Sequence, residues 1–159
     1  MQPWSLILPC ADVFPVAEEM MHQGFGIRFI VSGSSMWPLI RHNRDSVLLK
    51  ASIRPVRVGD IVLVCFESPK TKYLLHRVIR ICGGNMLETA GDNCTGADGM
   101  IETRQIIGRV EIIYRGPVTI DCNGIAWRIL FRIWCLCFPL RGILLKLLRA
   151  VCKLRAKRK

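Results

Sequence analysis

Apolar and polar residues alternate over several short stretches of this chain, which is the pattern of half-buried β-strands. Each stretch is bounded by residues that favour turns, mainly Gly, Pro, Asn, Asp and Ser. The expected strands cover residues 26–31, 45–50, 61–66, 72–82, 86–89, 105–114 and 118–120, with a bulge at Gly108. Many short strands joined by tight turns predict a mainly β fold, namely a small β-barrel-like or sandwich-like domain.

Two other regions carry apolar residues at helical spacing. The first covers residues 12–23, with Asp12 as the expected N-cap and Gly24 as the residue that ends the helix. The second begins at Trp127 and is interrupted at Pro139, so it predicts two short helices. Basic residues of each helix share one face, and a leucine-rich apolar face lies away from them. A short N-terminal helix is therefore expected before the strands, and two amphipathic helices after them.

These elements divide the chain into three parts. A helical segment covers residues 1–25, a β-rich domain covers 26–122, and a basic tail covers 123–159. The length of 159 residues suits one compact domain with an appendage. The net charge of +11 comes mainly from the tail: residues 126–159 hold ten Lys and Arg and no acidic residue, whereas residues 1–125 hold 13 basic and 12 acidic residues.

A basic amphipathic tail is typical of segments that lie in the interface of an anionic membrane. We therefore expect residues 127–159 to hold the protein at a membrane surface, on the cytoplasmic side, where Lys and Arg are enriched. The alternative is a tail packed on the protein's own core or on a partner. Nucleic acid is not an expected partner, because the basic residues lack a platform of stacking aromatic side chains.

No segment predicts secretion or membrane spanning. The start of the chain lacks a basic cluster and a long apolar run, so no signal peptide is expected. Only eight residues separate Arg132 from Arg141, whereas a spanning helix needs roughly 20 apolar residues. The eight cysteines stand mostly in apolar stretches and lack zinc spacing, which favours reduced thiols. No metal and no organic cofactor is expected.

A hydroxyl group with catalytic potential lies in the segment Ser-Gly-Ser-Ser-Met-Trp-Pro, residues 32–38. Gly33 and Pro38 favour a sharp turn directly after a strand. Such a turn can present the hydroxyl of Ser35, the residue before Met36, together with its own backbone N–H. Taken alone, Ser35 is better explained as a serine that caps a turn.

An imidazole and two carboxylates complete the chemistry. Strand period places His76 on the same face as Leu74 and Val78. Asp92 and Asp98 both stand in turn sequences, Gly-Asp-Asn and Asp-Gly. A histidine that acts as a general base needs an acceptor for its second ring nitrogen, and either aspartate can supply it. Serine, histidine and aspartate together are the components of a serine hydrolase.

Five motifs, taken in order, resemble those of the type I signal peptidase superfamily, which includes the self-cleaving LexA-type repressors. They are Ser-Gly-Ser-Ser-Met-Trp-Pro, Val-Gly-Asp-Ile-Val-Leu-Val at 58–64, His-Arg-Val at 76–78, Gly-Asp-Asn at 91–93 with Asp98, and Ile-Ile-Gly-Arg-Val at 106–110. The likeness covers residues 27–112. It implies a β-rich, partly barrel-like catalytic domain that hydrolyses peptide bonds.

The resemblance also implies a role for each residue. Ser35 matches the nucleophile. His76 stands where bacterial members place a lysine base, and this histidine form resembles the endoplasmic-reticulum and archaeal members. Asp98 matches the third member of a Ser-His-Asp triad, and Asp92 would brace the site. Gly33 stands where some bacterial members carry a serine that helps to bind the oxyanion, so more of that task would fall to the backbone N–H of Ser35.

The sequence thus predicts a serine endopeptidase that cleaves a leader or precursor peptide at a membrane. A self-processing protein of the LexA type is one alternative, and a catalytically inactive membrane adaptor is another. A lysine base is a further alternative, because Lys70 is nearby and Lys72 shares the face of His76 by strand period.

Overall fold

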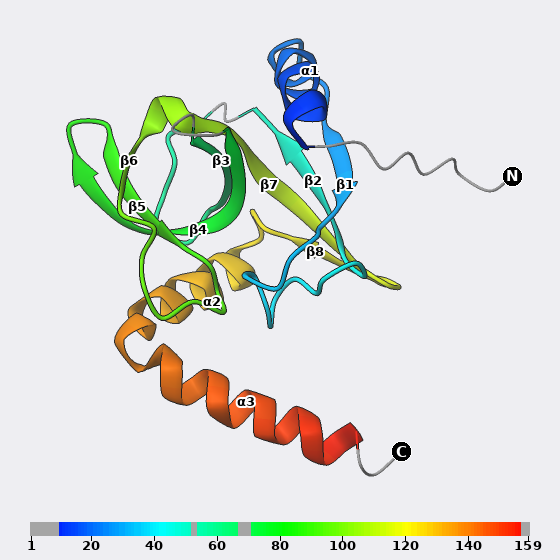
Figure 1. Cartoon of the computed structure of the whole chain (residues 1–159), viewed down its shortest axis with the longest axis vertical. Helices are drawn as coiled ribbons and strands as arrows, with labels where there is room; N and C mark the ends of the chain where they lie inside the picture. Colours follow the sequence, from blue (N-terminus) through cyan, green and yellow to red (C-terminus); the bar gives the residue numbers. More distant parts are fainter. Residues whose placement is uncertain (1–9, 52–53, 67–70, 157–159) are drawn as a thin grey trace, which may run out of the picture.

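One antiparallel sheet forms the centre of the computed structural model, which describes residues 10–51, 54–66 and 71–156 (Figure 1). Helix α1 (Cys10–His22) precedes the sheet, and helices α2 (Ile125–Leu136) and α3 (Arg141–Ala156) follow it. The eight strands are β1 (Ile27–Ile30), β2 (Ser46–Lys50), β3 (Ile61–Phe66), β4 (Lys72–Gly83), β5 (Met86–Ala90), β6 (Met100–Glu102), β7 (Ile106–Arg115) and β8 (Val118–Asp121).

Strand β7 is the organising strand of the sheet. The strand order is β1-β2-β7-β3-β4-β5-β6, and β8 pairs with β7 as well. β2 occupies one edge of β7, while β3 and β8 share the other edge, at residues 106–109 and 112–115 respectively. The outermost strands of this order, β1 and β6, do not pair with each other in the described ranges. The sheet is therefore strongly curved but does not close into a barrel (Figure 1).

Two apolar cores lie on the two faces of β3. Ile61 and Leu63 point into the larger core, which also contains buried side chains of α1, β2 and β7. Val62 and Val64 point into a smaller core, together with Val78, Leu87 and Ile101. Both faces of β3 are covered, which explains why its sequence is apolar at consecutive positions instead of alternating.

Helix α1 covers the larger core. Phe14, Ala17 and Met21 are buried at helical spacing, and the Phe14 ring lies 4.7 Å from the ring of Tyr73. Gly24 ends the helix with φ of 92°, a conformation that suits glycine, and its N–H donates to the Met21 carbonyl at 3.0 Å.

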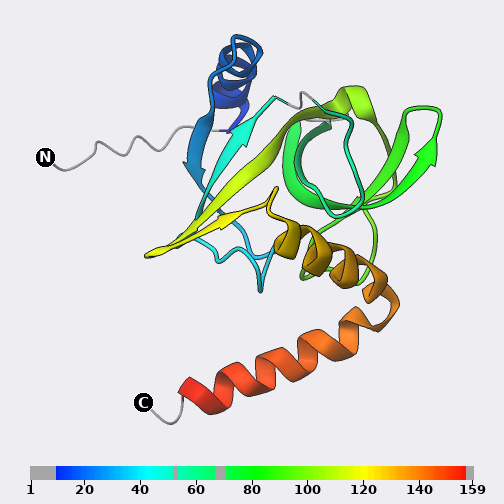
Figure 2. The same cartoon turned by 180° about the vertical axis from the view of Figure 1, so that it is seen from behind.

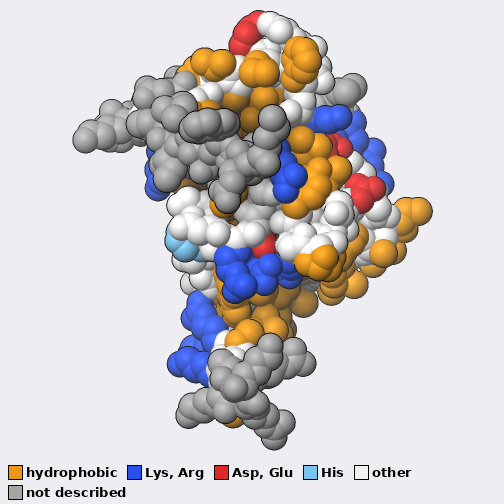
Figure 3. All heavy atoms as spheres, turned by 90° about the vertical axis from the view of Figure 1, so that its right-hand side faces the viewer, with side chains coloured by type: hydrophobic (Ala, Val, Ile, Leu, Met, Phe, Trp, Pro, Cys, Tyr) orange, Lys and Arg blue, Asp and Glu red, His pale blue; other side chains and the backbone are white. Residues whose placement is uncertain are grey.

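The C-terminal helices turn at Pro139, which lies in a 3-10 turn, η2 (Phe138–Leu140). Phe131 of α2 is buried in the larger core, and Leu145 of α3 is buried as well. Most of α3 is exposed, and it lies at the opposite end of the molecule from α1 (Figures 1 and 2). Basic and apolar side chains gather beside one another on the lower part of the molecule, where α3 lies (Figure 3).

The structure confirms the mainly β class, the short N-terminal helix and the break at Pro139. The sequence does not predict the short strand β6 or the 3-10 turn η1 (Thr103–Gln105) that follows it. The assignment of Asp12 as an N-cap is wrong, because the helix already includes Cys10. Between the expected strands at 61–66 and 72–82, residues 67–70 lie outside the described residues.

The expected bulge at Gly108 is confirmed. Leu63 pairs with Gly108 and Val64 pairs with Ile106, so Ile107 is the additional residue on β7. A Cβ atom at position 108 would lie only 2.9 Å from the backbone carbonyl oxygen of Lys50. The glycine therefore permits the close approach of β7 to β2.

We predict that Gly108→Ala lowers the free energy of unfolding by about 1–3 kcal/mol, because backbone must move to admit the methyl group. Urea unfolding followed by tryptophan fluorescence measures this change. Gly96→Ala is the matched control, since a Cβ atom at position 96 would meet no atom within 4 Å. Equal unfolding free energies for the two variants would contradict the close packing at Gly108.

Candidate active site

Strand β4 and the loop after β5 bring His76 and Asp98 together. His76 Nδ1 lies 2.6 Å from Asp98 Oδ2, and His76 is only 4% exposed. The same carboxylate oxygen accepts a hydrogen bond from the Thr89 hydroxyl at 2.7 Å, and the Asp98 N–H donates to the Thr89 carbonyl at 2.8 Å. Because Asp98 accepts the proton on Nδ1, the neutral imidazole carries its free electron pair on Nε2.

Ser35 lies in the long connection between β1 and β2. The two ends of this connection are held together, because the Val31 N–H donates to the Asp45 carbonyl at 3.0 Å and the Asn43 N–H donates to the Val31 carbonyl at 2.9 Å. Ser35 is half-buried, and the next residue, Met36, is buried in the larger core. The Met36 side chain thus anchors the serine next to the sheet.

Two hydrogen bonds shape the turn that carries the serine. The Trp37 N–H donates to the Ser34 carbonyl at 3.1 Å. The Gly33 N–H donates to His42 Nδ1 at 2.8 Å, and Gly33 has φ of 104°, which favours glycine. His42 is exposed, and its ring nitrogen supports this turn.

The serine and histidine segments meet at Gly91. A Cβ atom at position 91 would lie 2.7 Å from the carbonyl oxygen of Ser35, 2.9 Å from Cys94 Sγ and 3.1 Å from His76 Nε2. Three groups therefore surround one point that only a glycine leaves empty. Any side chain at position 91 would push Ser35 away from His76.

Asn93 holds the serine segment against this glycine. Its backbone N–H donates to the Ser35 carbonyl at 2.7 Å, and its side-chain amide donates to the Ser34 carbonyl at 3.2 Å. The Gly-Asp-Asn motif thus has a direct structural link to the Ser-Ser motif, although 58 positions separate Ser35 from Asn93.

The groups that would react have no competing partner. Among the described residues, His76 Nε2 is buried and has no hydrogen-bond partner, so Ser35 Oγ does not donate to it in this conformation. The backbone N–H of Ser35 takes part in no hydrogen bond within the same part of the chain. The structure therefore pairs His76 with Asp98 and places the backbone carbonyl of Ser35 close to His76 Nε2, on either side of Gly91.

Asp92 is engaged elsewhere, in a buried ion pair with Arg77. Arg77 Nε donates to Asp92 Oδ1 at 2.8 Å and Nη2 donates to Oδ2 at 2.7 Å, with both side chains 1% exposed. Burial lowers the pKa of Arg77, but the Asp92 carboxylate outweighs burial and holds that pKa above its ordinary value. The remaining N–H group, Nη1, donates to the Gly59 carbonyl at 2.7 Å.

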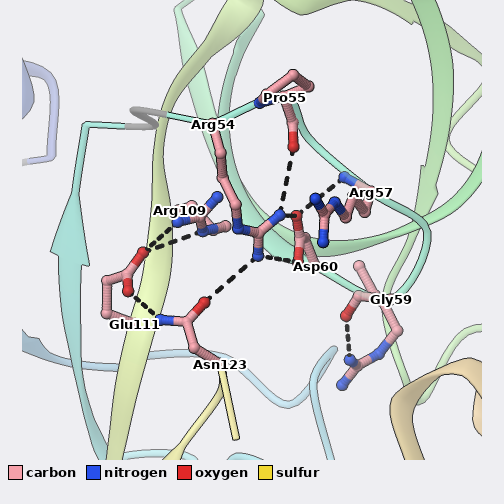
Figure 4. Close-up of polar contacts among 9 residues, drawn as sticks. Arg54, Pro55, Arg57, Gly59, Asp60, Arg109, Glu111 and Asn123 are labelled. Atoms are coloured by element: carbon pink, nitrogen blue, oxygen red, sulfur yellow. Dashed lines mark hydrogen bonds and ion pairs between the residues drawn. The ribbon is translucent and has the colours of Figure 1, made fainter. Parts of the chain in front are cut away.

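A polar network holds the turn that supplies the Gly59 carbonyl (Figure 4). Both terminal nitrogens of Arg54 lie 3.0 Å from carboxylate oxygens of Asp60. The network continues from Arg54 through Asn123 to Glu111. The Val-Gly-Asp motif is therefore structural here, because it presents a carbonyl to Arg77 and keeps the turn rigid.

The C-terminal helices contact the turn at residues 91–93 in three places. The contacts are Trp134 Nε1 to Asp92 Oδ1 at 2.9 Å, Arg141 Nη1 to the Gly91 carbonyl at 2.9 Å, and Arg149 Nη2 to Asn93 Oδ1 at 2.6 Å. Part of the tail therefore packs on the domain, which is the alternative to membrane contact that the sequence leaves open, and these contacts support the candidate site.

Arg141 is completely buried, which the sequence does not predict. Its guanidinium stacks on the rings of Phe138 at 4.5 Å and Trp134 at 5.4 Å. Burial lowers the pKa of Arg141, and within the described ranges its Nε and Nη2 groups have no hydrogen-bond partner. The aromatic residues around Arg141 are the one sequence signal for this position, because guanidinium groups stack on aromatic rings.

Asp45 holds the far end of the serine connection. Arg41 Nη2 donates to Asp45 Oδ1 at 2.7 Å, and Arg115 Nε donates to Asp45 Oδ2 at 3.2 Å. A second group of Arg115 donates to the Pro38 carbonyl at 2.9 Å. Burial raises the pKa of Asp45, but the hydrogen bonds from Arg41 and Arg115 outweigh burial and hold the pKa below its ordinary value. Sequence reasoning misses this residue.

The two lysines that could serve as an alternative base are Lys70 and Lys72. Lys72 is exposed at the first position of β4, roughly 13 Å along the strand from His76 at the usual rise per residue. Lys70 lies outside the described residues.

Other kinds of site are not evident. A small hollow beside α2 is lined by residues 57–61 and by Arg128, Phe131 and Arg132, and it includes none of the candidate catalytic residues. In the described part of the chain, no group of three His, Cys, Asp or Glu side chains could hold a metal ion. None of the helices within those ranges combines the length and the apolar character that crossing a bilayer requires.

Comparison with models of protein families, with curated proteins and with solved structures finds no match to this chain. The geometry around Gly91 and the order of the sequence motifs are therefore the basis for any functional assignment.

We predict that acid destabilises this protein in part through Asp45. A carboxyl group whose pKa is lower in the folded state favours folding at neutral pH, and that contribution is lost as pH falls through the folded pKa. Urea unfolding at a series of pH values measures the effect. Between neutral pH and values below about 3.9, the ordinary pKa of aspartate, the wild type should lose more unfolding free energy than Asp45→Asn does. Parallel curves would contradict the prediction.

Proposed function

We propose that this chain is a serine endopeptidase of the signal peptidase and LexA class, which cleaves a leader or precursor peptide through an acyl-enzyme. Ser35 is the nucleophile, His76 is the general base, and Asp98 orients the imidazole. The chain would share the β-rich catalytic fold of that class, in a form whose sheet stays open.

One observation carries the proposal. The Ser35 carbonyl and His76 Nε2 both lie within about 3 Å of the point where a Gly91 side chain would begin, while Asp98 accepts the proton of Nδ1 at 2.6 Å. A histidine that serves only in the core normally has both ring nitrogens satisfied, because an unpaired buried polar group costs free energy. The free electron pair of Nε2 next to a serine segment supports the role of His76 as a general base.

The acylation step follows from this arrangement. Rotation of the Ser35 side chain brings Oγ to His76 Nε2, which takes the hydroxyl proton as Oγ attacks the carbonyl carbon of the peptide. Asp98 stabilises the imidazolium that forms, and Thr89 keeps the carboxylate in position. The imidazolium then gives its proton to the leaving amine. In the second half of the reaction, His76 takes a proton from a water molecule that attacks the acyl carbonyl carbon. The imidazolium then returns the proton to Ser35 Oγ as the acyl group leaves.

The oxyanion would be bound by backbone. The N–H of Ser35 is free among the described residues, whereas the N–H of Gly33 is already used by His42. A donor that is fixed in place before the reaction stabilises developing charge without reorganisation. This division gives His42 and Gly33 a role in shaping the turn, and gives Ser35 both the nucleophile and the donor.

The tail would hold the peptidase at an anionic membrane surface. Ile143, Leu147 and Leu154 of α3 are each more than half exposed, and Lys146 and Lys153 on the same helix are exposed beside them. Apolar side chains partition into the interface, and each Lys or Arg near an anionic surface contributes about 1 kcal/mol. Substrates anchored in that membrane would then reach the site by diffusion within the plane of the membrane.

We predict that a fluorophosphonate probe labels Ser35 and that Ser35→Ala abolishes labelling. His76→Gln should slow labelling by about 10² or more, because the base that takes the hydroxyl proton is lost. Peptide mass spectrometry identifies the labelled residue, and Ser34→Ala serves as the matched control. Labelling that survives Ser35→Ala would contradict the proposal, and an inactive adaptor would show no labelling at all.

The same assay separates the two aspartates. Asp98→Asn should slow labelling strongly and leave the melting temperature nearly unchanged, because Asp98 is partly exposed and acts on the imidazole. Asp92→Asn should instead lower the free energy of unfolding by about 3–5 kcal/mol, since it leaves Arg77 as an unpaired buried charge. The opposite pattern would assign the triad carboxylate to Asp92.

We predict that the intact chain floats with anionic vesicles more than with neutral vesicles. The variant Ile143→Glu/Leu147→Glu should float less, because it places negative charge on the exposed apolar face of α3. Val118→Glu, in the exposed strand β8, is the matched control. Truncation of the tail is unsuitable, since it would also remove Trp134 from Asp92. Equal flotation of all three proteins would remove the membrane assignment.

A further inference from the structure

We propose that Cys94 is a covalent modification site of the catalytic centre, which takes small thiol-reactive molecules such as disulfides and thiosulfonates. An adduct on Cys94 Sγ would push the Ser35 segment away from His76, because the space beside Gly91 does not admit even a Cβ atom, and would so stop the reaction of Ser35. This inference rests on the proposed function.

The position of Cys94 is fixed by the turn that brings the catalytic segments together. The Cys94 N–H donates to the Gly91 carbonyl at 3.0 Å, which closes the turn at residues 91–94. Its Sγ lies 2.9 Å from the Cβ position of Gly91, the point that is 3.1 Å from His76 Nε2 and 2.7 Å from the Ser35 carbonyl. The thiol therefore shares one small space with the base and with the serine backbone.

A second observation points to a ligand in this space. Nε2 of His76 is buried and has no hydrogen-bond partner among the described residues, so neither Ser35 Oγ nor Cys94 Sγ forms a hydrogen bond with it. An unpartnered nitrogen of this kind can accept the proton of whichever group turns toward it. A thiol beside such a base reacts more readily, because the thiolate is the nucleophilic form.

Access and selectivity also favour Cys94. Cys94 is partly exposed, as are Cys65 and Cys137, and of these three it is the one whose Sγ lies beside the Gly91 Cβ position. Cys122 and Cys135 are buried, and burial raises the pKa of both thiols, that of Cys122 to about 12. Cys82 and Cys152 are exposed and lie in β4 beyond His76 and in α3, and neither is among the three groups nearest to the Gly91 Cβ position.

The chemistry is a simple exchange. With methyl methanethiosulfonate, Cys94 Sγ attacks the sulfur that carries the methyl group, a new S–S bond forms, and methanesulfinate leaves with the electron pair of the broken S–S bond. The thiol proton passes to His76 Nε2 and then to water. Dithiothreitol reverses the reaction by reducing the mixed disulfide and releasing methanethiol.

The experiment uses the full chain with Cys82→Ser and Cys152→Ser, which removes two exposed thiols outside the site. The protein is treated with methyl methanethiosulfonate, and peptide mass spectrometry follows the rate of adduct formation on Cys94. A fluorophosphonate probe then measures the reactivity of Ser35 before treatment, after treatment and after dithiothreitol. The same measurements are made with Cys94→Ser and with His76→Gln.

We expect the adduct on Cys94 to abolish labelling of Ser35, dithiothreitol to restore it, and Cys94→Ser to keep labelling despite treatment. His76→Gln should slow adduct formation by about tenfold or more, because the neighbouring base is lost. Unchanged Ser35 labelling in protein modified at Cys94 would overturn the inference, as would an adduct rate that His76→Gln does not alter. If Ser35 is unreactive in untreated protein, the proposed function fails, and the His76 dependence of the adduct rate alone decides whether Cys94 is a reactive site.

Discussion

The buried ion pair between Arg77 and Asp92 is the interaction on which the rest of the candidate site depends. The two side chains form two parallel hydrogen bonds of 2.8 and 2.7 Å, and each is 1% exposed. Charges taken out of water need an opposite charge and further hydrogen bonds to offset the loss of hydration. Two distant parts of the chain provide further hydrogen bonds to this pair: the Gly59 carbonyl accepts from Arg77, and Trp134 donates to Asp92.

This ion pair fixes a turn whose three residues have different tasks. Asp92 in the middle fastens the turn to β4. Gly91 lacks a side chain where Ser35 and His76 come together, and Asn93 holds the serine segment through two hydrogen bonds. The His76 imidazole and the Arg77 guanidinium are neighbours in one strand, so β4 presents them on opposite faces. The positions of the proposed base and of the proposed nucleophile are thereby set by the same few contacts.

Much of the fold was predictable because its strands alternate and its turns use glycine and asparagine. Strand β3 and the break at Pro139 follow directly from local sequence. The candidate residues Ser35, His76 and Asp98 were also predictable, but only because their motifs resemble those of a known superfamily, since each is ambiguous alone. The contact between His76 and Asp98 is a tertiary one, which no local pattern encodes.

The contribution of the C-terminal helices was not predictable. A basic residue at helical spacing reads the same whether it faces lipid or protein, so the sequence does not distinguish Arg141, which is buried, from Lys146, which is exposed. The role of Trp134 depends on a partner 42 residues away. Asp45 and Thr89 are ordinary strand and turn residues by sequence, and only the assembled sheet shows that they hold the serine connection and Asp98.

A crystal structure of the full chain after reaction with diisopropyl fluorophosphate would test this account at the level of atoms. The account predicts a phosphorus atom bonded to Ser35 Oγ, His76 Nε2 within hydrogen-bond distance of the adduct, Asp98 on Nδ1, and the Arg77–Asp92 pair intact beneath the Gly91 turn. An adduct on another residue, or a serine segment that lies away from Gly91 with His76 turned elsewhere, would contradict it.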